Sequence, residues 1–299
     1  MSSAIPTLAA VVREKTGATW SRAKSLCSDG RVTVDGVRCT DPAARVPATA
    51  TVEVHEHGAR RKATSLADEA FVHVDDDLVV LDKPAGLLSV ADDEGSRDTL
   101  ADHARTQLRR RGERDGKLGV VHRLDRDTSG LMVFARNASA QRALAALFRA
   151  HDIERTYVAL AHGDVAAARI ESHLLPDRGD GLRGSHGHYR RAKGPPPGEA
   201  RLAITHVEPI EALRGATLVV CRLETGRQHQ IRIHLAERGH PLLGEKVYVR
   251  DYPGPVIDAP RTMLHARVLG FVHPRTGRAM RFERAAPEDF EALRSRLRS

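Results

Sequence analysis

The chain has few of the residues that mark disulfide-rich, membrane or carbohydrate-binding proteins. Its 299 residues include three cysteines and 4% aromatic residues. Cys27, Cys39 and Cys221 are odd in number and lack a partner at metal-ligand spacing, so the sequence predicts neither a disulfide framework nor a zinc site. No stretch approaches the roughly 18 apolar residues of a membrane span, and the start of the chain has no secretory pattern. We therefore expect a cytoplasmic protein with no membrane partner.

Acidic residues are outnumbered by basic ones. Lys and Arg total 47 against 39 Asp and Glu, which gives a formal net charge of +8. Such a balance makes nucleic acid a plausible partner, although a merely soluble, Arg-rich protein would show the same balance. The length predicts two domains, or one domain with an appendage.

Residues 1–54 have the pattern of a small α/β domain. Two short helical segments come first, and Ser21 stands at the N-cap position of the second. A strand, an Asp-Gly turn and a closing strand follow. Arg22, Lys24 and Arg31 gather positive charge within this segment. Beyond it, the polar and charged residues 55–69 are typical of a linker to a larger domain over residues 70–299.

The most informative run of the chain is Val121–Gly130, which precedes the apolar segment Leu131–Ala135. It places an acid, a cation and a Thr-Ser-Gly turn at the mouth of a predicted strand. Taken alone, Asp125 would be a turn-capping residue, with His122 and Arg123 as ordinary surface residues.

A second dense segment, Leu223–Pro241, predicts a helix that Thr225 could cap. Gln228, His229 and Arg232 would then lie along one polar edge of this helix, because residues three and four apart are neighbours on a helix surface. The sequence thus offers an amide, an imidazole and a guanidinium together.

Two other kinds of site fit the sequence less well. His229 and His234 would be about 140° apart around a helix, which is poor geometry for a shared metal ion, so no metal site is predicted. Asp125 and Asp127 could be the carboxyl pair of a glycoside hydrolase, but that chemistry usually adds aromatic platforms, and this chain is poor in aromatics.

Five segments, in order, resemble RluA-type RNA pseudouridine synthases over about residues 71–290. They are Leu81–Leu87, His122–Asp125 with Thr128–Gly130, Thr156–Leu160, Gly226–Arg227 with His229–Arg232, and Leu264–Ala266 with Phe271–Pro274. The first 54 residues resemble the alpha-L RNA-binding module of a ribosomal small-subunit protein. The resemblance implies an α+β fold, with a mixed, mostly antiparallel sheet and peripheral helices, plus a small N-terminal RNA-binding domain.

What the resemblance implies for catalysis can be stated residue by residue. The reaction isomerises uridine to pseudouridine without a redox step, so no cofactor is expected. The resemblance makes Asp125 the catalytic carboxylate, Arg232 the cation that holds it ionised, and Tyr157 the residue that stacks on the detached base and relays a proton. Whether the carboxylate attacks the ribose or the base stays open. His122 is expected to be a structural hydrogen-bonding residue.

The implied partner is structured RNA, with ribosomal RNA favoured over transfer RNA. Arg123 is similar to the residue that replaces the everted nucleotide, and Arg22, Lys24, Arg31 and Arg227 are expected to contact RNA. A monomer is expected.

A rival hypothesis is a non-catalytic RNA-binding protein with a degenerate synthase domain, which should have lost the catalytic acid. The chain does depart from the usual family pattern. Gln228 replaces a common Thr, Gly244–Val249 replaces a Gly-Asp…Tyr-Gly segment, and Arg155 replaces a frequent Lys. None of these changes touches Asp125.

Overall fold

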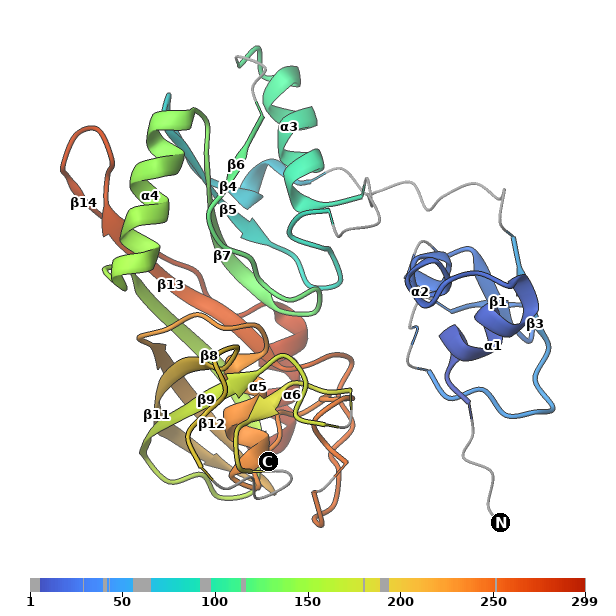
Figure 1. Ribbon diagram of the computed structural model, residues 1–299. Coiled ribbons are helices and arrows are strands. Elements are labelled where there is room, and N and C mark those ends of the chain that lie inside the picture. The colour runs from blue at the N-terminus through green and yellow to red at the C-terminus, as the bar shows by residue number, and fades with distance from the viewer. Residues whose placement is uncertain are drawn as a thin grey trace. The chain divides into compact units, whose positions relative to one another are not determined.

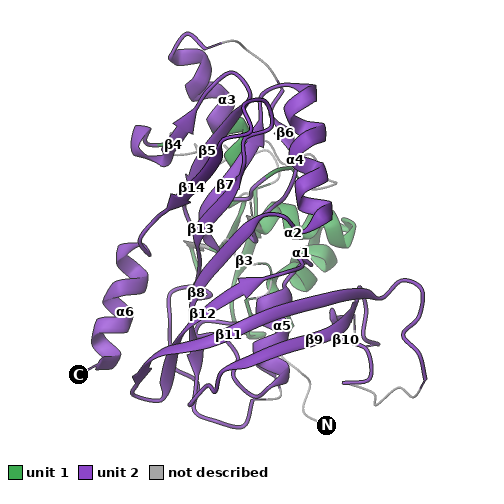
Figure 2. Cartoon of the chain, turned by 90° about the vertical axis from the view of Figure 1, so that its left-hand side faces the viewer, with its two compact units in different colours: residues 1–66, 90–103 green, residues 67–89, 104–299 purple. Residues whose placement is uncertain are grey.

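The structure of the chain is a computed structural model (Figure 1). It describes residues 6–28, 30–39, 42, 44–55, 66–91, 98–113, 117–179, 181–188, 194–250 and 252–298. Two compact units are present, unit 1 with residues 1–66 and 90–103 and unit 2 with residues 67–89 and 104–299 (Figure 2). Most of the predicted linker, residues 56–65, lies outside the described residues, so the domain limits expected from the sequence stay a prediction. In the described part of the chain no helix is both long and apolar enough to cross a membrane.

Unit 1 consists mainly of two helices and a small antiparallel sheet. Its elements are α1 (Leu8–Thr16), α2 (Trp20–Ser28), β1 (Val32–Val34), β2 (Val37–Arg38) and β3 (Val52–Val54). Strand β1 lies between β2 and β3. Asp35 and Gly36 join β1 to β2 and both have positive φ, as a two-residue hairpin turn favours. This order of elements agrees with the sequence prediction.

The predicted cap of α2 is wrong by two residues. Ser21 lies inside the helix, and the hydroxyl of Thr19 accepts the backbone N–H of Arg22 at 3.2 Å. Both residues are good capping types, and the position at which the chain leaves its extended conformation decides between them.

Unit 2 is built on one eleven-stranded sheet with helices at its periphery. The sheet order is β10-β9-β11-β12-β8-β13-β7-β5-β4, with β14 paired to β13 and β6 to β7. The strands are β4 (Phe71–Val74), β5 (Leu78–Lys83), β6 (Gly119–Val120), β7 (Ser129–Ala135), β8 (Glu154–His162), β9 (Ala168–Leu175), β10 (Gly184–Ser185), β11 (Arg201–Leu213), β12 (Ala216–Leu223), β13 (Leu264–Val272) and β14 (Ala279–Glu283). The helices are the 3₁₀ turn η1 (Asp68–Ala70), α4 (Ala138–Ala150), α5 (Gln230–Glu237) and α6 (Glu288–Arg298), while α3 (Leu100–Arg110) begins in unit 1 and ends in unit 2.

Only one pairing between these strands is parallel, that of β7 with β13; the other described pairs are antiparallel. In Figure 1, β13 runs through the middle of the unit. Helix α4 packs on β6 and β7, whereas α5 and α6 pack on β11. Every residue of β7 is buried, which is why its sequence after Gly130 is continuously apolar rather than alternating. The α+β class with a mixed, mostly antiparallel sheet is confirmed.

The register of the three central strands brings distant residues into line. Ala266 of β13 is aligned with Gly130 of β7 on one side and with Tyr157 of β8 on the other. Gly130 has φ +112°, and a Cβ there would overlap the carbonyl oxygen of Ala266. The Thr-Ser-Gly turn is therefore needed for the close approach of β7 to β13, in addition to turn formation.

The helix predicted over the segment from residue 223 is shorter than expected. Helix α5 begins at Gln230, after His229 in a left-handed conformation. Thr225 is not its cap: its hydroxyl accepts the N–H of Ile204 and donates to the amide oxygen of Gln230, both at 2.8 Å. Gln228 consequently lies before the helix and does not share an edge with Arg232.

Replacing Gly130 with alanine is expected to lower the free energy of unfolding by about 2–4 kcal/mol, because the substitution adds backbone strain and a clash with Ala266. Gly112→Ala is the matched control, since Gly112 has φ +73° but open space around its Cα. It should cost about 1 kcal/mol. Urea unfolding measures both, and equal losses would contradict the close-approach argument.

Candidate active site

Asp125 lies in the loop between β6 and β7, and its neighbours on both sides are held by buried groups. The ammonium of Lys83 donates to the carbonyl oxygen of Arg126 at 2.8 Å. The hydroxyl of Ser89 accepts the backbone N–H of Leu124 and donates to the carbonyl oxygen of the same residue. Both anchoring side chains come from β5 and the segment after it. The loop is thereby fixed, and the Asp125 side chain remains 22% exposed.

Lys83 is fully buried in this arrangement. Burial lowers the pKa of its ammonium to about 7, while the charges of Asp127 and Asp125 act in the opposite direction. Lys83 belongs to a segment that resembles the family, but the sequence predicted no role for it. Its position shows that it anchors the Asp125 loop through the backbone carbonyl oxygen of Arg126.

The guanidinium of Arg232 bridges two carboxylates. Its Nη1 donates to Oδ2 of Asp125 at 3.1 Å, while Nε and Nη2 donate to the two oxygens of Glu245 at 2.7 and 2.8 Å. Burial would lower the pKa of this guanidinium, but Glu245 and Asp125 together raise it. The bidentate pair with Glu245 orients the planar group so that its remaining nitrogen faces Asp125.

Glu245 is the second carboxylate, and its side chain is completely buried. Burial raises its pKa, but hydrogen bonds from Arg232 and from the backbone of Val247 and Tyr248 outweigh this and hold the pKa below 4.5. The preceding Gly244 has φ +74°, and a Cβ there would overlap the carbonyl oxygen of Arg261. The chain can therefore reach this position only with glycine before the glutamate.

Tyr157 lies on β8, and its ring is buried. Burial raises the pKa of its phenol to about 12; Arg155 lowers it and the charge of Asp125 adds to the rise. The tyrosine is thus protonated at neutral pH and close enough to Asp125 to sense its charge.

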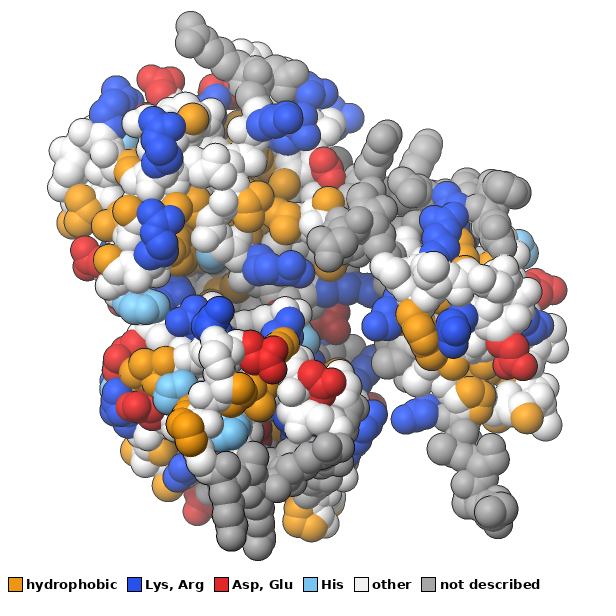
Figure 3. Space-filling model, in the orientation of Figure 1, with side chains coloured by type: hydrophobic (Ala, Val, Ile, Leu, Met, Phe, Trp, Pro, Cys, Tyr) orange, Lys and Arg blue, Asp and Glu red, His pale blue; other side chains and the backbone are white. Residues whose placement is uncertain are grey.

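The residues expected to contact RNA occupy several surfaces. Arg123 is exposed in the same loop as Asp125. Arg227 is half-buried before α5, where its Nε donates to the carbonyl oxygen of Leu202 at 2.9 Å. In unit 1, Arg22 and Lys24 are exposed on α2, and Arg31 is partly buried just before β1. Figure 3 shows blue Lys and Arg side chains on the visible faces of both units.

His122 has the structural role that was expected of it. Its Nε2 accepts the backbone N–H of Val133 at 3.1 Å, and its ring stacks on Phe148 with centroids 4.6 Å apart. Burial, and to a lesser extent Arg155, lowers its pKa to about 3. The ring is therefore neutral and able to accept.

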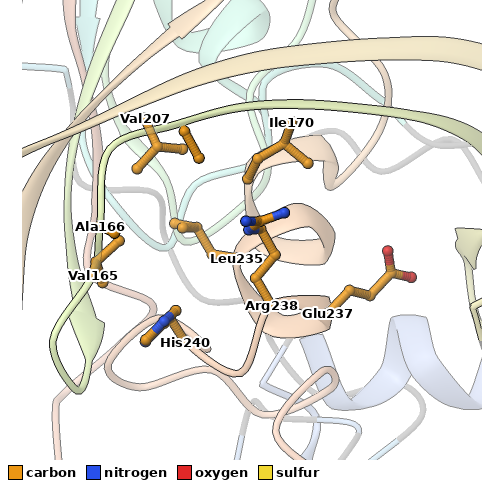
Figure 4. A pocket seen from close by; sticks show the side chains of 9 residues that line it. Val165, Ala166, Ile170, Val207, Leu235, Glu237, Arg238 and His240 are labelled. Atoms are coloured by element: carbon orange, nitrogen blue, oxygen red, sulfur yellow. The ribbon is translucent and has the colours of Figure 1, made fainter.

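A cavity of about 300 Å³ lies at the end of α5 (Figure 4). Its lining is mostly aliphatic, and its acidic residue, Glu237, already bonds Ser185. The residues that line it include none of Asp125, Tyr157 and Arg232. This cavity is separate from the site around Asp125.

Asp75, Asp77 and His273 form the group with metal-ligating proximity among the described residues. Its carboxylates already have partners: Asp75 bonds His73 at 2.7 Å and His273 at 3.1 Å, and Asp77 pairs with Arg275. These contacts connect the β4–β5 turn to the segment after β13. We interpret the group as a structural link.

Comparison with known proteins identifies the class. The RNA pseudouridylate synthase family matches residues 77–237, and the S4 domain matches residues 8–52. The chain therefore belongs to the RNA pseudouridylate synthase family and carries an S4 domain at its N-terminal side. Both resemblances drawn from the sequence are confirmed.

Individual relatives carry more specific names. The chain is 33% identical over 285 residues to ribosomal large subunit pseudouridine synthase D of Zymomonas mobilis, covering 91% of this chain and 87% of that protein. It is 36% identical over 234 residues to the protein of that name from Nitrosomonas europaea, and this match covers 75% of the chain. The match spans 64% of that relative, which is less than two thirds of its length. Among solved structures, human RNA pseudouridylate synthase domain containing 4 aligns with a TM-score of 0.61 at 22% identity, over 77% of this chain and 93% of that one. This last likeness supports the fold.

Sequence reasoning missed Lys83, Glu245, His229 and Tyr248 as parts of the site. The sequence placed His229 in a family segment and on the polar edge of a predicted helix, and it was rejected as a metal ligand, but no role was predicted for it. A signal did exist for Glu245, because the segment that departs from the family pattern still places an acid after glycine. The hydrogen bonds between Glu245 and Arg232 could not be predicted, because the two residues are 13 positions apart in the chain.

Glu245→Gln should lower the free energy of unfolding by about 3–5 kcal/mol at pH 7, because it leaves the buried guanidinium of Arg232 with one carboxylate. Since the pKa of Glu245 is depressed in the folded protein, its stabilising effect is complete above pH 4.5 and is lost as the pH falls through the folded-state value. The difference in the free energy of unfolding between wild type and Glu245→Gln should therefore shrink as the pH falls. Urea unfolding between pH 3 and 7 tests this, with the exposed Glu199→Gln as control. A difference that stays constant with pH would contradict it.

Proposed function

We propose that this protein isomerises uridine to pseudouridine in large-subunit ribosomal RNA, with Asp125 as the catalytic carboxylate. Membership of the synthase family supports the reaction, and the names of the relatives support the substrate. The observation that carries the assignment of the residue is the partly exposed Asp125 carboxylate, 3.1 Å from a buried guanidinium and close to a buried phenol.

The reaction breaks the bond from ring nitrogen 1 to the ribose and forms a bond from ring carbon 5 to the same ribose carbon. A proton leaves carbon 5, and one returns to nitrogen 1, so atoms and electrons balance within the nucleotide. Asp125 is the group aimed at the reacting atoms, and the guanidinium of Arg232 donates a hydrogen bond to its Oδ2.

Tyr157 is proposed to stack on the detached base and relay the carbon 5 proton. Because its pKa lies near 12, the phenol is neutral at neutral pH. It can act as a relay only if it gives up its own proton as it accepts another. A buried, flat ring suits the stacking role.

A uridine within folded RNA must be everted to reach Asp125, at a cost of a few kcal/mol. Arg123 is exposed two residues before Asp125 and is proposed to occupy the gap that the nucleotide leaves. Arg227 is proposed to contact the RNA beside the site, and Arg22, Lys24 and Arg31 to hold RNA at the S4 domain.

We also propose that the protein acts in the cytoplasm and as a monomer. Its three cysteines form no disulfide within the described residues, which suits a reducing compartment. Asp125, Tyr157 and Arg232 come from one chain, so the site needs no residue from a second copy.

Asp125→Asn should reduce tritium release from ribosomal RNA labelled at uridine carbon 5 by about 10,000-fold or more, because the catalytic carboxylate is lost. RNA affinity should stay unchanged, since Arg232 keeps Glu245 as its partner. Asp127→Asn is the control and should remain active. Equal release by wild type and Asp125→Asn would rule out the assignment.

Replacing Arg22 and Lys24 together with Gln should weaken RNA binding and make the slope of log K against log salt about 2 units shallower. Trp20 provides the readout, because it is the single tryptophan and is 47% exposed beside these residues. Arg142 and Arg149, exposed on α4, are replaced with Gln as the charge-matched control. An unchanged slope in the first variant would show that these residues do not contact phosphate.

A further inference from the structure

His229 has a backbone conformation that its place in the chain does not explain. Among the described residues, Asp35, His151 and His229 are the non-glycine residues with positive φ. Asp35 lies in a hairpin turn, and His151 is the left-handed cap that ends α4, both common uses of this conformation. His229 instead stands at the N-terminal end of α5, where caps are normally extended, and its side chain caps nothing. Strain of this kind often serves a functional site.

The conformation directs the imidazole toward the catalytic carboxylate. Nε2 of His229 lies 3.8 Å from Oδ1 of Asp125, while Arg232 bonds the other oxygen, Oδ2. On its far side, Nδ1 of His229 lies 2.8 Å from the hydroxyl of Tyr248. Each oxygen of Asp125 is thus faced by a different group.

Electrostatics selects one tautomer for His229. Burial lowers the pKa of the imidazole despite the charge of Asp125, so the ring is neutral at neutral pH. Burial also raises the pKa of Tyr248, whose phenol stays protonated and can donate to Nδ1. Nε2 then carries the ring proton and presents it to Asp125. The other tautomer would turn a lone pair toward a carboxylate, which is repulsive.

We propose that His229 is a positioning residue for the isomerisation, whose Nε2–H fixes the rotation of the Asp125 carboxylate while Tyr248 fixes the ring. The proposal rests on the function assigned above to Asp125. A carboxylate held at one oxygen can still rotate, because the terminal torsion of Asp is broad. A second donor removes that freedom. The 3.8 Å separation is longer than a hydrogen bond, and we expect it to shorten when the nucleotide enters, as catalytic hydrogen bonds often do.

Two substitutions of His229 separate positioning from backbone strain. Asn tolerates positive φ and puts its amide where Nδ1 stood, so His229→Asn keeps the backbone and the contact with Tyr248 but not the donor to Asp125. His229→Gln puts an amide N–H near the position of Nε2. If the role were only structural, Asn would be the better replacement. If the role is to orient Asp125, Gln would be the better replacement.

The experiment measures single-turnover tritium release and RNA affinity with carbon 5-labelled ribosomal RNA. We expect His229→Asn to lose up to about 100-fold in rate, and His229→Gln to stay within about tenfold of wild type, both with unchanged RNA affinity. Tyr248→Phe removes the donor to Nδ1 and should also lower the rate but not the affinity. Thermal melting checks the fold of each variant. If both His229 variants fail to fold, the rate of Tyr248→Phe alone tests the inference.

Three results would overturn the inference: full activity of His229→Asn, a faster rate for Asn than for Gln, or a fully active Tyr248→Phe when the His229 variants do not fold. Each of these results counts against the inference only if the wild-type protein is active and Asp125→Asn is inactive in the same assay. If instead wild type releases no tritium, or Asp125→Asn releases as much, the proposed function itself fails. The two failures are therefore distinguishable.

Discussion

The guanidinium of Arg232, shared between Glu245 and Asp125, is the interaction on which the site depends. A buried cation needs a buried anion, and Glu245 supplies it with both oxygens. Because that bidentate bond fixes the guanidinium plane, the direction of the remaining nitrogen toward Asp125 is fixed as well. The Asp125 carboxylate thus meets a cation that is already oriented and has little freedom to move.

The fold brings these three residues together from separate parts of the sheet. Asp125 precedes β7, Arg232 belongs to α5, and Glu245 follows α5 in a turn that requires Gly244. The parallel pairing of β7 with β13 places β7 two strands from β8 and so brings the Asp125 loop close to Tyr157. Since Gly130 permits this close pairing, the turn residues of the motif serve both the fold and the site.

Much of the fold was visible in the sequence because it rests on local signals. The apolar run after Gly130 is a fully buried strand, and the Asp-Gly turn does join two strands of unit 1. The errors occurred where two residues compete for one local role. Thr19 rather than Ser21 caps α2, and His229 rather than Thr225 precedes α5 because Thr225 is bonded to Gln230 and to β11.

The sequence by itself determined the family, and the resemblance to that family predicted the contact between Asp125 and Arg232, because the family motifs are residue types in a fixed order along the chain. The tertiary structure alone decided which second carboxylate neutralises Arg232, which buried lysine anchors the loop, and which imidazole faces Asp125. These contacts join residues far apart in the chain. Their energies depend on burial and distance, which become defined only when the sheet has closed around them.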